Sequence, residues 1–521
     1  MYPSIKVQTQ PDKLAAILPS TGETLTYGQL NARSNQLAHA LRAAGLKAGD
    51  HVAAFLDNRL AYLEITCACM RSGLYLTPVN RYLTAAEAAY IVDDCDATVL
   101  IASAALDQSA ALGALSPRCQ VKLSVGGHIE GFTDYDATLM PQPVEDLPDE
   151  RLGALMLYSS GTTGKPKGIL RALPSQDVSL GNPNLNFTGG MYGFSESTIY
   201  LSPAPLYHAA PLGSATAALQ YGGTVVMMDK FDAETALQLI EQYKVTHSQW
   251  VPAMFVRLLK LAPEIRSKYD LSSQICAIHA AAPCPVEVKR QMIDWFGPVV
   301  LEYYSSTEGA GMASINSTDW LAHQGSVGRA YGKAFHICDD AGNELPRGTP
   351  GNIYGELPSG VQFEYHKAPE KTASVRHNLH QDWVTTGDIG YLDDDGYLYL
   401  TDRQAFMIIS GGVNIYPQQI EDALALHPKI ADVAVIGVPS EEMGEEVKAV
   451  VELAPGVAPS EELAEEIKEF VRARLGRQLV PRSVDFVDQL PRLPTGKLYK
   501  KELRARYWPA DDGKTSLAAR G

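Results

Sequence analysis

Residues Tyr158-Ser-Ser-Gly-Thr-Thr-Gly-Lys-Pro-Lys-Gly168 carry the strongest structural signal in this chain, directly after an apolar run at 152–157. The apolar run predicts a buried strand, and the segment after it has the composition of a loop that holds phosphate. Glycines let backbone N–H groups point toward an oxygen, and hydroxyl groups add further donors. Lysine side chains then offset the negative charge. We therefore expect a strand that opens into a phosphate-binding loop.

Two other interpretations of this segment are weaker. Segments rich in glycine and serine often serve as flexible linkers, but the order of hydroxyl, glycine and lysine residues here is more particular than a linker needs. The segment also departs from the Walker A pattern, which requires Ser or Thr after its lysine, because Lys165 is followed by Pro166. A P-loop phosphotransferase is therefore disfavoured, and such an enzyme would release ADP instead of AMP.

Length, charge and cysteine content restrict the class of protein. The chain has 521 residues, enough for two or more domains, and its formal net charge of −16 argues against nucleic acid as a partner. Seven scattered cysteines without a Cys-x-x-Cys pair are typical of reduced thiols. We find no signal peptide and no apolar run near the roughly 20 residues of a membrane span, so a cytoplasmic protein without a transmembrane segment is expected.

Alternating strand and helix patterns run through much of the chain. Thr26 is predicted to cap a helix, and strands and helices then alternate at 50–56, 61–72, 97–102, 224–228, 233–243 and 275–281. Residues 316–400 change to short β runs with turn signals. After a boundary near Arg403, strands at 433–438 and 447–453 and an amphipathic helix at 461–475 predict a small second domain. The pattern favours an α/β fold with largely parallel sheets.

Two segments carry groups suited to a metal–nucleotide complex. Tyr303-Tyr-Ser-Ser-Thr-Glu-Gly309 contains Glu308, whose hard carboxylate oxygen suits Mg²⁺. Thr386-Gly-Asp-Ile-Gly-Tyr391 contains Asp388, which can accept hydrogen bonds from both hydroxyls of a vicinal diol, and Arg403 supplies directional donors. Taken alone, these residues fit a surface carboxylate, a turn aspartate and a salt bridge at the boundary better than a ligand site.

Two more segments lie in the expected small domain. Ile409-Ser-Gly-Gly-Val-Asn-Ile-Tyr-Pro417 contains a pair of glycines that lets the backbone approach a ligand closely. Pro491-Arg-Leu-Pro-Thr-Gly-Lys497 places a lysine near the end of the chain, where most lysines are simply solvated. The order in which these segments occur is more informative than any one of them.

The five segments together resemble, in the same order, the motifs of the acyl-adenylate-forming enzymes, the superfamily of acyl-CoA synthetases, luciferases and peptide-synthetase adenylation domains. The resemblance extends to about Lys501. It implies a large N-terminal domain, residues 1–402, made of two α/β subdomains and a β-rich one. It also implies a small mobile α+β domain, residues 403–521. Ser305 stands where the family usually has glycine, and Ala405, at the implied hinge, where it usually has a polar residue.

The resemblance also implies roles for individual residues. Lys497, Glu308, Thr163 and His208 would be catalytic, and Glu308 would hold Mg²⁺. The implied ATP- or AMP-binding residues are Ser159, Ser160, Gly161, Thr162, Thr163, Gly164, Lys165, Lys167, Ala281, Tyr304, Ser305, Thr307, Asp388, Arg403 and Lys497. The implied CoA-binding residues are Ser410, Gly411 and Gly412. The acyl pocket would be lined by His208, Ala209, Gly213, Ala280 and Tyr303, mostly small side chains that leave room for a bulky apolar acid.

The implied reaction joins an apolar carboxylic acid of the fatty, aryl or steroid type to CoA, with Mg²⁺ as cofactor and ATP and CoA as co-substrates. An acyl-AMP would form first, and the CoA sulfur would then attack it. An enzyme that loads a carrier protein instead of CoA would share every motif, and it stays open as an alternative. A non-catalytic nucleotide-binding protein is a third interpretation, but it would have no need for Lys497 and Glu308. The identity of the acid and the oligomeric state, with a homodimer as one option, are left open.

Overall fold

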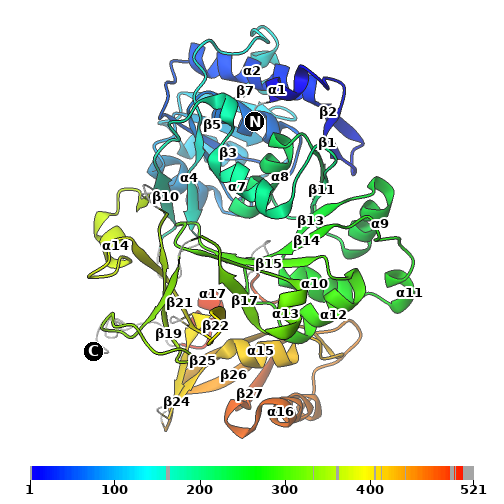
Figure 1. The fold of residues 1–521 in the computed structure, drawn as a ribbon, viewed down its shortest axis with the longest axis vertical. Coiled ribbons are helices and arrows are strands. Elements are labelled where there is room, and N and C mark those ends of the chain that lie inside the picture. The colour runs from blue at the N-terminus through cyan, green and yellow to red at the C-terminus, as the bar shows by residue number, and fades with distance from the viewer. Residues whose placement is uncertain are drawn as a thin grey trace.

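The structure is a computed structural model of the chain. It describes residues 3–159, 165–332, 334–358, 363–403, 406–411, 413–440, 442–492, 498 and 500–508, without the side chains of Ser159, Arg403 and Lys501. Figure 1 shows the N-terminal part at the top of the molecule, the middle of the chain below it, and the C-terminal part at the bottom. Among the helices of these described residues, none combines the length and apolar character that crossing a membrane requires.

The first α/β unit is a parallel sheet. Among the described residues it has six strands in the order β7-β6-β5-β3-β4-β8. Parallel neighbours need a crossover connection, which helices supply here. The strands are β3 (His51–Phe55), β4 (Tyr75–Pro78), β5 (Val99–Ser103), β6 (Val121–Val125), β7 (Thr133–Asp134) and β8 (Ala154–Leu155). The helices are α1 (Pro3–Val7), α2 (Tyr27–Ala43), α3 (Ala61–Arg71), α4 (Ala85–Asp94), α5 (Ser109–Leu115) and α6 (Tyr135–Leu139).

The predicted cap of α2 is confirmed. The Thr26 side chain accepts a hydrogen bond from the backbone N–H of Gln29, and the Gln29 side chain accepts one from the backbone of Thr26. This reciprocal capping box satisfies two helix N–H groups that would otherwise lack partners. The face that carries Leu30, Leu37 and Leu41 is buried. The helix therefore begins where its cap lies and packs through the side that its apolar spacing predicts.

The second unit is the parallel half of a larger sheet, followed by its antiparallel continuation. The described residues place thirteen strands in the order β18-β19-β21-β22-β17-β16-β15-β14-β13-β11-β12-β1-β2. Its parallel part is β1 (Leu14–Leu18), β12 (Thr224–Met227), β11 (Ile199–Ser202), β13 (His247–Trp250), β14 (Cys276–His279) and β15 (Val300–Ser305), with β2 (Glu23–Thr26) antiparallel at one edge. Its helices are α7 (Pro183–Tyr192), α8 (Ala209–Gln220), α9 (Ala233–Tyr243), α10 (Pro252–Leu259), α11 (Pro263–Arg266) and α12 (Val286–Phe296), and a short 3₁₀ turn, η1 (Val178–Leu180), precedes α7.

The antiparallel part confirms the β-rich segment expected at 316–400. Its strands are β16 (Met312–Asn316), β17 (Ser326–Ala330), β18 (Phe335–Cys338), β19 (Gly351–Glu356), β21 (Trp383–Leu392) and β22 (Tyr397–Arg403), with short helices α13 (Ser317–Ala322) and α14 (Pro369–Ser374). The change from parallel to antiparallel pairing occurs between β15 and β16. The motif that contains Glu308 occupies the connection between these two strands, so it lies where the sheet changes character.

The prediction of one strand at 152–157 was wrong. Residues 154–155 form β8, which pairs with β4, whereas Leu157–Ser159 form β9 and pair with β10 (Lys167–Arg171) in a separate sheet. In that sheet β10 lies between β9 and β20 (Phe363–Tyr365). Met156, fully buried between the two short strands, marks the point where the chain changes sheets. Apolar residues continue through the change, since Met156 is buried and Ala154, Leu155 and Leu157 are half-buried, so the sequence shows no break.

The C-terminal unit packs helices on its own sheet, coloured yellow to red at the bottom of Figure 1. Ile420, Ile436 and Ile467 are buried in its core. Its elements are β23 (Ile408–Ser410), β24 (Val413–Ile415), α15 (Pro417–Leu424), β25 (Ile430–Ser440), β26 (Gly444–Leu453), α16 (Glu461–Leu475), the 3₁₀ turn η3 (Arg477–Leu479), β27 (Ser483–Val487) and α17 (Lys500–Ala505). The predicted helix at 461–475 is confirmed. We keep a division into residues 1–402 and 403–521 as a proposal, since β22 runs through the boundary as one strand.

Candidate active site

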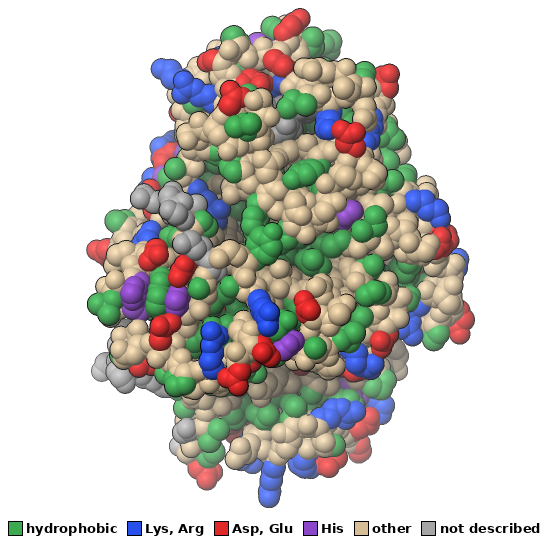
Figure 2. Space-filling model, viewed as in Figure 1, with side chains coloured by type: hydrophobic (Ala, Val, Ile, Leu, Met, Phe, Trp, Pro, Cys, Tyr) green, Lys and Arg blue, Asp and Glu red, His purple; other side chains and the backbone are tan. Residues whose placement is uncertain are grey.

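A large cleft of about 2940 Å³ lies between the α/β units and the C-terminal unit. Figure 2 shows apolar side chains gathered in the hollow at mid-height of the molecule. The ends of β13, β14 and β15 open into this cleft. Ligands of open α/β sheets bind outside the carboxyl ends of parallel strands. Many of the predicted site residues line it: Lys165, Lys167, His208, Ala209, Gly213, Ala280, Ala281, Tyr303, Tyr304, Ser305, Thr307, Glu308 and Asp388.

The two ends of the predicted phosphate loop lie next to each other. Ser159 on β9 pairs in register with Lys167 on β10, so the segment between them is a hairpin connection. Ser160, Gly161, Thr162, Thr163 and Gly164 fall outside the described residues, as does the side chain of Ser159. The Lys165 ammonium lies 4.7 Å from the centre of the Tyr90 ring, and that of Lys167 lies 5.5 Å from the Tyr365 ring. Both lysines therefore stand at the rim of the loop.

Glu308 is nearly buried beside these cations. Its side chain accepts a hydrogen bond from the Tyr365 hydroxyl, with 2.8 Å between Oε1 and the phenol oxygen. Burial lowers the pKa of Lys167 and of Arg171, and in both cases the charge of Glu308 acts in the opposite direction. A carboxylate held in this way, among cations and facing a cleft, is suited to a metal–phosphate complex.

Arg171 is a site residue that the sequence analysis missed. Its Nη2 donates to the carbonyl oxygen of Thr307 at 2.5 Å, and its guanidinium lies so close to Gly309 that a Cβ there would clash with it. Lys167, Ile169 and Arg171 all line the cleft. Residues two apart on a strand share a face, so the spacing from Lys167 was a signal that could have pointed to Arg171.

Asp388 and Tyr304 are brought together from distant parts of the chain. The Tyr304 hydroxyl donates to Asp388 Oδ2 at 2.8 Å, and Thr386 Oγ1 donates to the same oxygen at 3.0 Å. Asp388 on β21 is paired in register with Arg403 on β22, although the Arg403 side chain is not described. The predicted ribose-binding pair thus occupies opposite positions on neighbouring strands. The Tyr304 ring lies beside Phe335, with 5.8 Å between ring centres.

Ala281 has an unusual backbone conformation. Its φ is +77°, a region that residues other than glycine rarely occupy. It lies directly after β14, between the buried Ala280 and the exposed Ala282. Non-glycine residues held at positive φ cluster at ligand-binding sites. Ala281, implied above to bind ATP or AMP, therefore stands in a strained backbone conformation.

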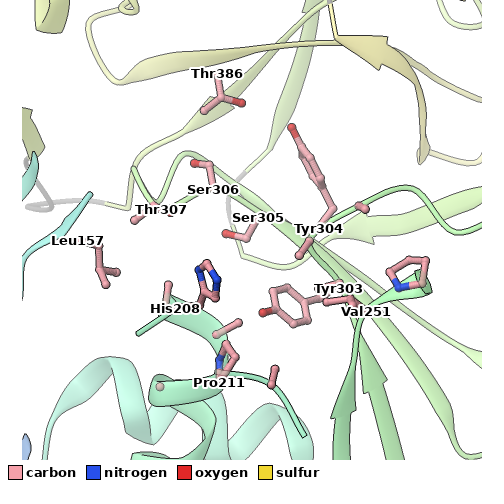
Figure 3. Close-up of a pocket in the computed structure, with 18 of the residues that line it drawn as sticks. Leu157, His208, Pro211, Val251, Tyr303, Tyr304, Ser305, Ser306, Thr307 and Thr386 are labelled. Atoms are coloured by element: carbon pink, nitrogen blue, oxygen red, sulfur yellow. The ribbon is translucent and has the colours of Figure 1, made fainter. Parts of the chain in front are cut away.

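Side chains of two helices and two strands form the acyl end of the cleft. His208 is the N-terminal cap residue of α8 and lies against Tyr207, with ring centres 4.0 Å apart. Figure 3 shows the Tyr303 hydroxyl pointing toward the space beside His208 and Pro211. Ser305, Ser306 and Thr307 border the same space from the other side. A Cβ added at Gly213 would meet no heavy atom within 4 Å, so the helix leaves open space at that position.

The expectation of a pocket walled mostly by small residues is incomplete. Tyr303 is half-buried, and its hydroxyl accepts a long hydrogen bond of 3.4 Å from Nε2 of Gln249. Tyr192 on α7 also lines the cleft, with its ring centre 6.2 Å from that of Tyr303. No sequence signal indicated that Gln249 and Tyr192 belong to the site, because they come from segments without a recognisable motif.

The C-terminal unit reaches the same cleft through residues on both sides of the segment that contains Lys497. Leu498 and Lys500 line the cleft, and Arg492 binds the Asp432 carboxylate through two nitrogens, one of them at 2.7 Å. Lys497, Gly412 and Ala405 fall outside the described residues. Ser410 and Gly411 are not among the cleft-lining residues and lie on the β23–β24 hairpin. Among the described residues, the structure therefore brings Leu498 and Lys500 to the cleft but not Ser410 and Gly411.

Hydrogen bonds and apolar packing join the two units directly. The Lys260 ammonium, just after α10, donates to the carbonyl oxygens of Ile430 at 2.8 Å and Ala431 at 3.0 Å. Ala425 and Leu426 also pack on the apolar cluster of the large unit. Burial lowers the pKa of Lys260, while Asp432 and Glu452 raise it.

Comparison with known proteins places this geometry in a family. The model of the AMP-binding enzymes matches residues 4–361, and that of their C-terminal domain matches residues 419–497. A feruloyl-CoA synthase of Amycolatopsis sp is 34% identical over 93% of the chain and 94% of its own length. The fatty acid–[acyl-carrier-protein] ligase ScoC of Streptomyces coeruleorubidus is 33% identical over 97% of the chain and 95% of its own length. ATP-bound MatB from Rhodopseudomonas palustris superposes with a TM-score of 0.81 at 28% identity, over 97% of the chain and 99% of MatB.

Proposed function

This chain belongs to the family of AMP-binding enzymes, and from that premise we propose that it is a carboxylate–CoA ligase that activates an apolar acid as its acyl-adenylate. The observation that carries the proposal is the convergence in one cleft of Glu308, the lysines Lys165 and Lys167, and the Asp388–Tyr304 pair. Each of these groups suits a different part of ATP.

In the first half-reaction a carboxylate oxygen of the acid attacks the α-phosphate, and pyrophosphate leaves. Lys165, Lys167 and the hydroxyl groups of the loop at 159–164 would bind the phosphates, and Asp388 with Arg403 would hold the ribose. Lys497 would neutralise the charge that develops as the new P–O bond forms, which is electrostatic stabilisation of the transition state. His208 would lie beside the carboxylate of the acid.

The residues present suit a bound Mg²⁺. Glu308 offers a nearly buried carboxylate whose Oε1 is oriented by Tyr365, and hard oxygen ligands are the ones that Mg²⁺ prefers. Bound there, the ion would offset phosphate charge. Glu308 is thus proposed as the residue that holds it.

In the second half-reaction the sulfur of CoA attacks the acyl carbon, and AMP leaves. Gly412 would have to approach the cleft for this step, whereas Ser410 and Gly411 lie away from it. We therefore assign the arrangement described here to the adenylation step. A rotation of the small domain about a hinge at Ala405 would produce the second arrangement.

An acyl carrier protein in place of CoA is the alternative acceptor, favoured by the likeness to ScoC. The test is pyrophosphate release across short, medium, long, aryl and steroid-type acids, with CoA and a carrier protein supplied separately. Acid-dependent pyrophosphate release with AMP as product, followed by thioester formation on CoA, is expected. ADP formation, or the absence of any acid-dependent release, would overturn the proposal. A cytoplasmic location and a homodimer remain proposals that fractionation and sedimentation would check.

A further inference from the structure

The acyl end of the cleft combines apolar walls with a small group of uncharged polar side chains. Helix α7 contributes Phe187, Thr188 and Met191 to the lining, and α8 contributes Gly213 and Ser214. Both helices are described in full, and neither places a charged side chain on the cleft. A second charge on the acid would therefore be buried here without an opposite charge from either helix, which is costly.

The polar group is a chain of hydrogen bonds that ends at the pocket. The Tyr200 hydroxyl, fully buried, donates to Oε1 of Gln249 at 3.0 Å. This bond orients the amide, so that Nε2 points toward the Tyr303 hydroxyl. The order of donors and acceptors is therefore fixed from the core outward, from Tyr200 through Gln249 to Tyr303.

The last link of this chain is weaker than the first. The separation of 3.4 Å between Nε2 of Gln249 and the Tyr303 hydroxyl exceeds the usual range of an N–H···O bond. Buried polar groups normally complete their hydrogen bonds, and this pair lines a cavity large enough to hold a ligand. A polar ligand atom beside Tyr303 and Gln249 could form shorter hydrogen bonds with these two side chains than they form with each other.

The hydroxyl groups at this point are donors. Burial raises the pKa of Tyr303 and of Tyr192, so both phenols stay protonated at neutral pH. Because the Tyr303 hydroxyl oxygen accepts a hydrogen bond from Gln249, its proton is left to donate. The Tyr192 hydroxyl also interacts with the Tyr303 hydroxyl. The site can therefore donate hydrogen bonds to the oxygen of a neutral polar group.

We propose that the acid carries one neutral hydrogen-bonding group, a hydroxyl or a carbonyl, in addition to its carboxylate, and that Tyr303 and Gln249 bind it. This inference rests on the proposed function and narrows its substrate class. The body of the acid is apolar and lies between α7 and α8. A site built to bind a hydroxyl discriminates against the analogue that lacks it, because its own polar groups are then left without partners.

The test compares matched acids in the unmodified enzyme by acid-dependent pyrophosphate exchange. The ring series is para-hydroxyphenylpropanoate, its para-methyl analogue of similar size and its para-carboxy analogue. The chain series is an ω-hydroxy acid of medium length and its unsubstituted parent. We expect kcat/KM to favour the hydroxy acid of at least one series by about tenfold, the scale of one hydrogen bond, and the para-carboxy acid to be the poorest.

Two variants and a matched control assign the preference to its residues. Tyr303→Phe and Gln249→Met should each reduce the preference to within about twofold, because each removes one partner of the hydroxyl. Tyr331→Phe removes the same atom from an exposed ring at the rim of the cleft and should leave the preference unchanged. Thermal unfolding of each variant checks that it is folded.

Each outcome decides a different question. A methyl or unsubstituted acid that matches the hydroxy acid in both series overturns this inference, even if the variants fail to fold. A preference that survives in folded Tyr303→Phe and Gln249→Met also overturns it. Absence of exchange with every acid, in an enzyme that is folded, overturns the proposed function itself and this inference with it.

Discussion

The two walls of the cleft are held in place by different kinds of contact. The acyl wall is built on β13 and β15, interior strands of the large sheet, and Trp250 and Tyr200 beneath it are completely buried. The opposite wall belongs to the small C-terminal unit. Its described contacts with the large unit include the two hydrogen bonds of Lys260, a hydrogen bond from the Gln418 N–H to Asp402 Oδ2 at 3.2 Å, and apolar packing of Ala425 and Leu426. Moving the first wall would disrupt the core, whereas moving the second, as the proposed domain rotation requires, would break contacts between two units instead. Substrate recognition is thus assigned to the fixed wall, and the change between half-reactions to the movable one.

The largest effect is expected from the movable wall, at Lys497. Lys497→Ala should reduce adenylation by about 10²–10³ or more, the scale for removing one preorganised charge. Thioester formation from supplied acyl-AMP should be largely retained, because the role proposed for Lys497 belongs to the first step alone. Pyrophosphate exchange and acyl-transfer assays measure the two steps separately. Equal losses in both would show that this wall does not serve one step alone.

The next effect is expected at Glu308 on the fixed wall. Glu308→Gln keeps the size of the side chain and removes its charge, so Mg²⁺·ATP should be used about tenfold or more less efficiently. Raised Mg²⁺ should restore part of the activity. A titration of Mg²⁺ at constant ATP measures this. A Mg²⁺ dependence equal to that of the unmodified enzyme would remove Glu308 from the metal site.

A smaller effect is expected where the two walls meet, at Lys260. Lys260→Met removes both hydrogen bonds to the small unit and should slow adenylation about three- to tenfold, given the usual net value of such bonds. Transfer from supplied acyl-AMP should change less than twofold, and Lys260→Arg should retain most of the adenylation rate.

Lys268→Met is the matched control, since Lys268 is an exposed lysine of the same unit that contacts Glu234 at 3.3 Å. It should leave both half-reactions unchanged. If Lys260→Met slowed both half-reactions alike, the hydrogen bonds of Lys260 to the small unit would not act on adenylation in particular. The proposal that the movable wall controls the change between half-reactions would then lose this support.

The smallest effect is expected at Gly213, inside the fixed wall. Alanine is favoured over glycine within a helix, so Gly213→Ala should raise the free energy of unfolding by about 0.5–1 kcal/mol. Its methyl group would enter the open space of the acyl end and lower kcat/KM for the bulkiest acids a few-fold. Chemical denaturation and a size series of acids measure the two effects.

Gly190→Ala is the control for this substitution. Gly190 lies within α7, away from the cleft, and a Cβ there would meet only the Tyr221 hydroxyl at 3.9 Å. It should give a similar gain in stability without a change in selectivity. A loss of selectivity in both variants would mean that the space at Gly213 is not used by the substrate.

Local signals in the sequence were enough to place many of the elements. The cap at Thr26 and the helix at 461–475 follow from short-range rules, namely capping chemistry and 3.6-residue periodicity. The region around Met156 shows where such rules end. Two strands of different sheets meet there without a turn signal, and only tertiary packing separates them.

The site was predictable to the extent that its residues lie in motifs. Glu308, Asp388 and Tyr304 stand in recognisable segments, and the structure brings all three to one cleft. Gln249 and Tyr192 lie in an ordinary strand and an ordinary helix. Their place at the pocket depends on which strands are neighbours and how a helix is rotated, and neither can be derived from the residue types.

The ladder between β21 and β22 ends with the pair Asp388–Arg403, directly before the chain enters the small domain. A rotation of that domain would therefore act first on the Asp388–Arg403 pair, while the rest of β22 stays paired in the large sheet. With Asp388 and Arg403 in their proposed roles, the ribose would lie close to the axis of this rotation. Atoms at the axis of a rotation are displaced least. The nucleotide would therefore stay bound during the rotation, while residues of the small domain farther from the axis enter or leave the cleft. The bound nucleotide would then be both a reactant and a fixed point about which the small domain rotates.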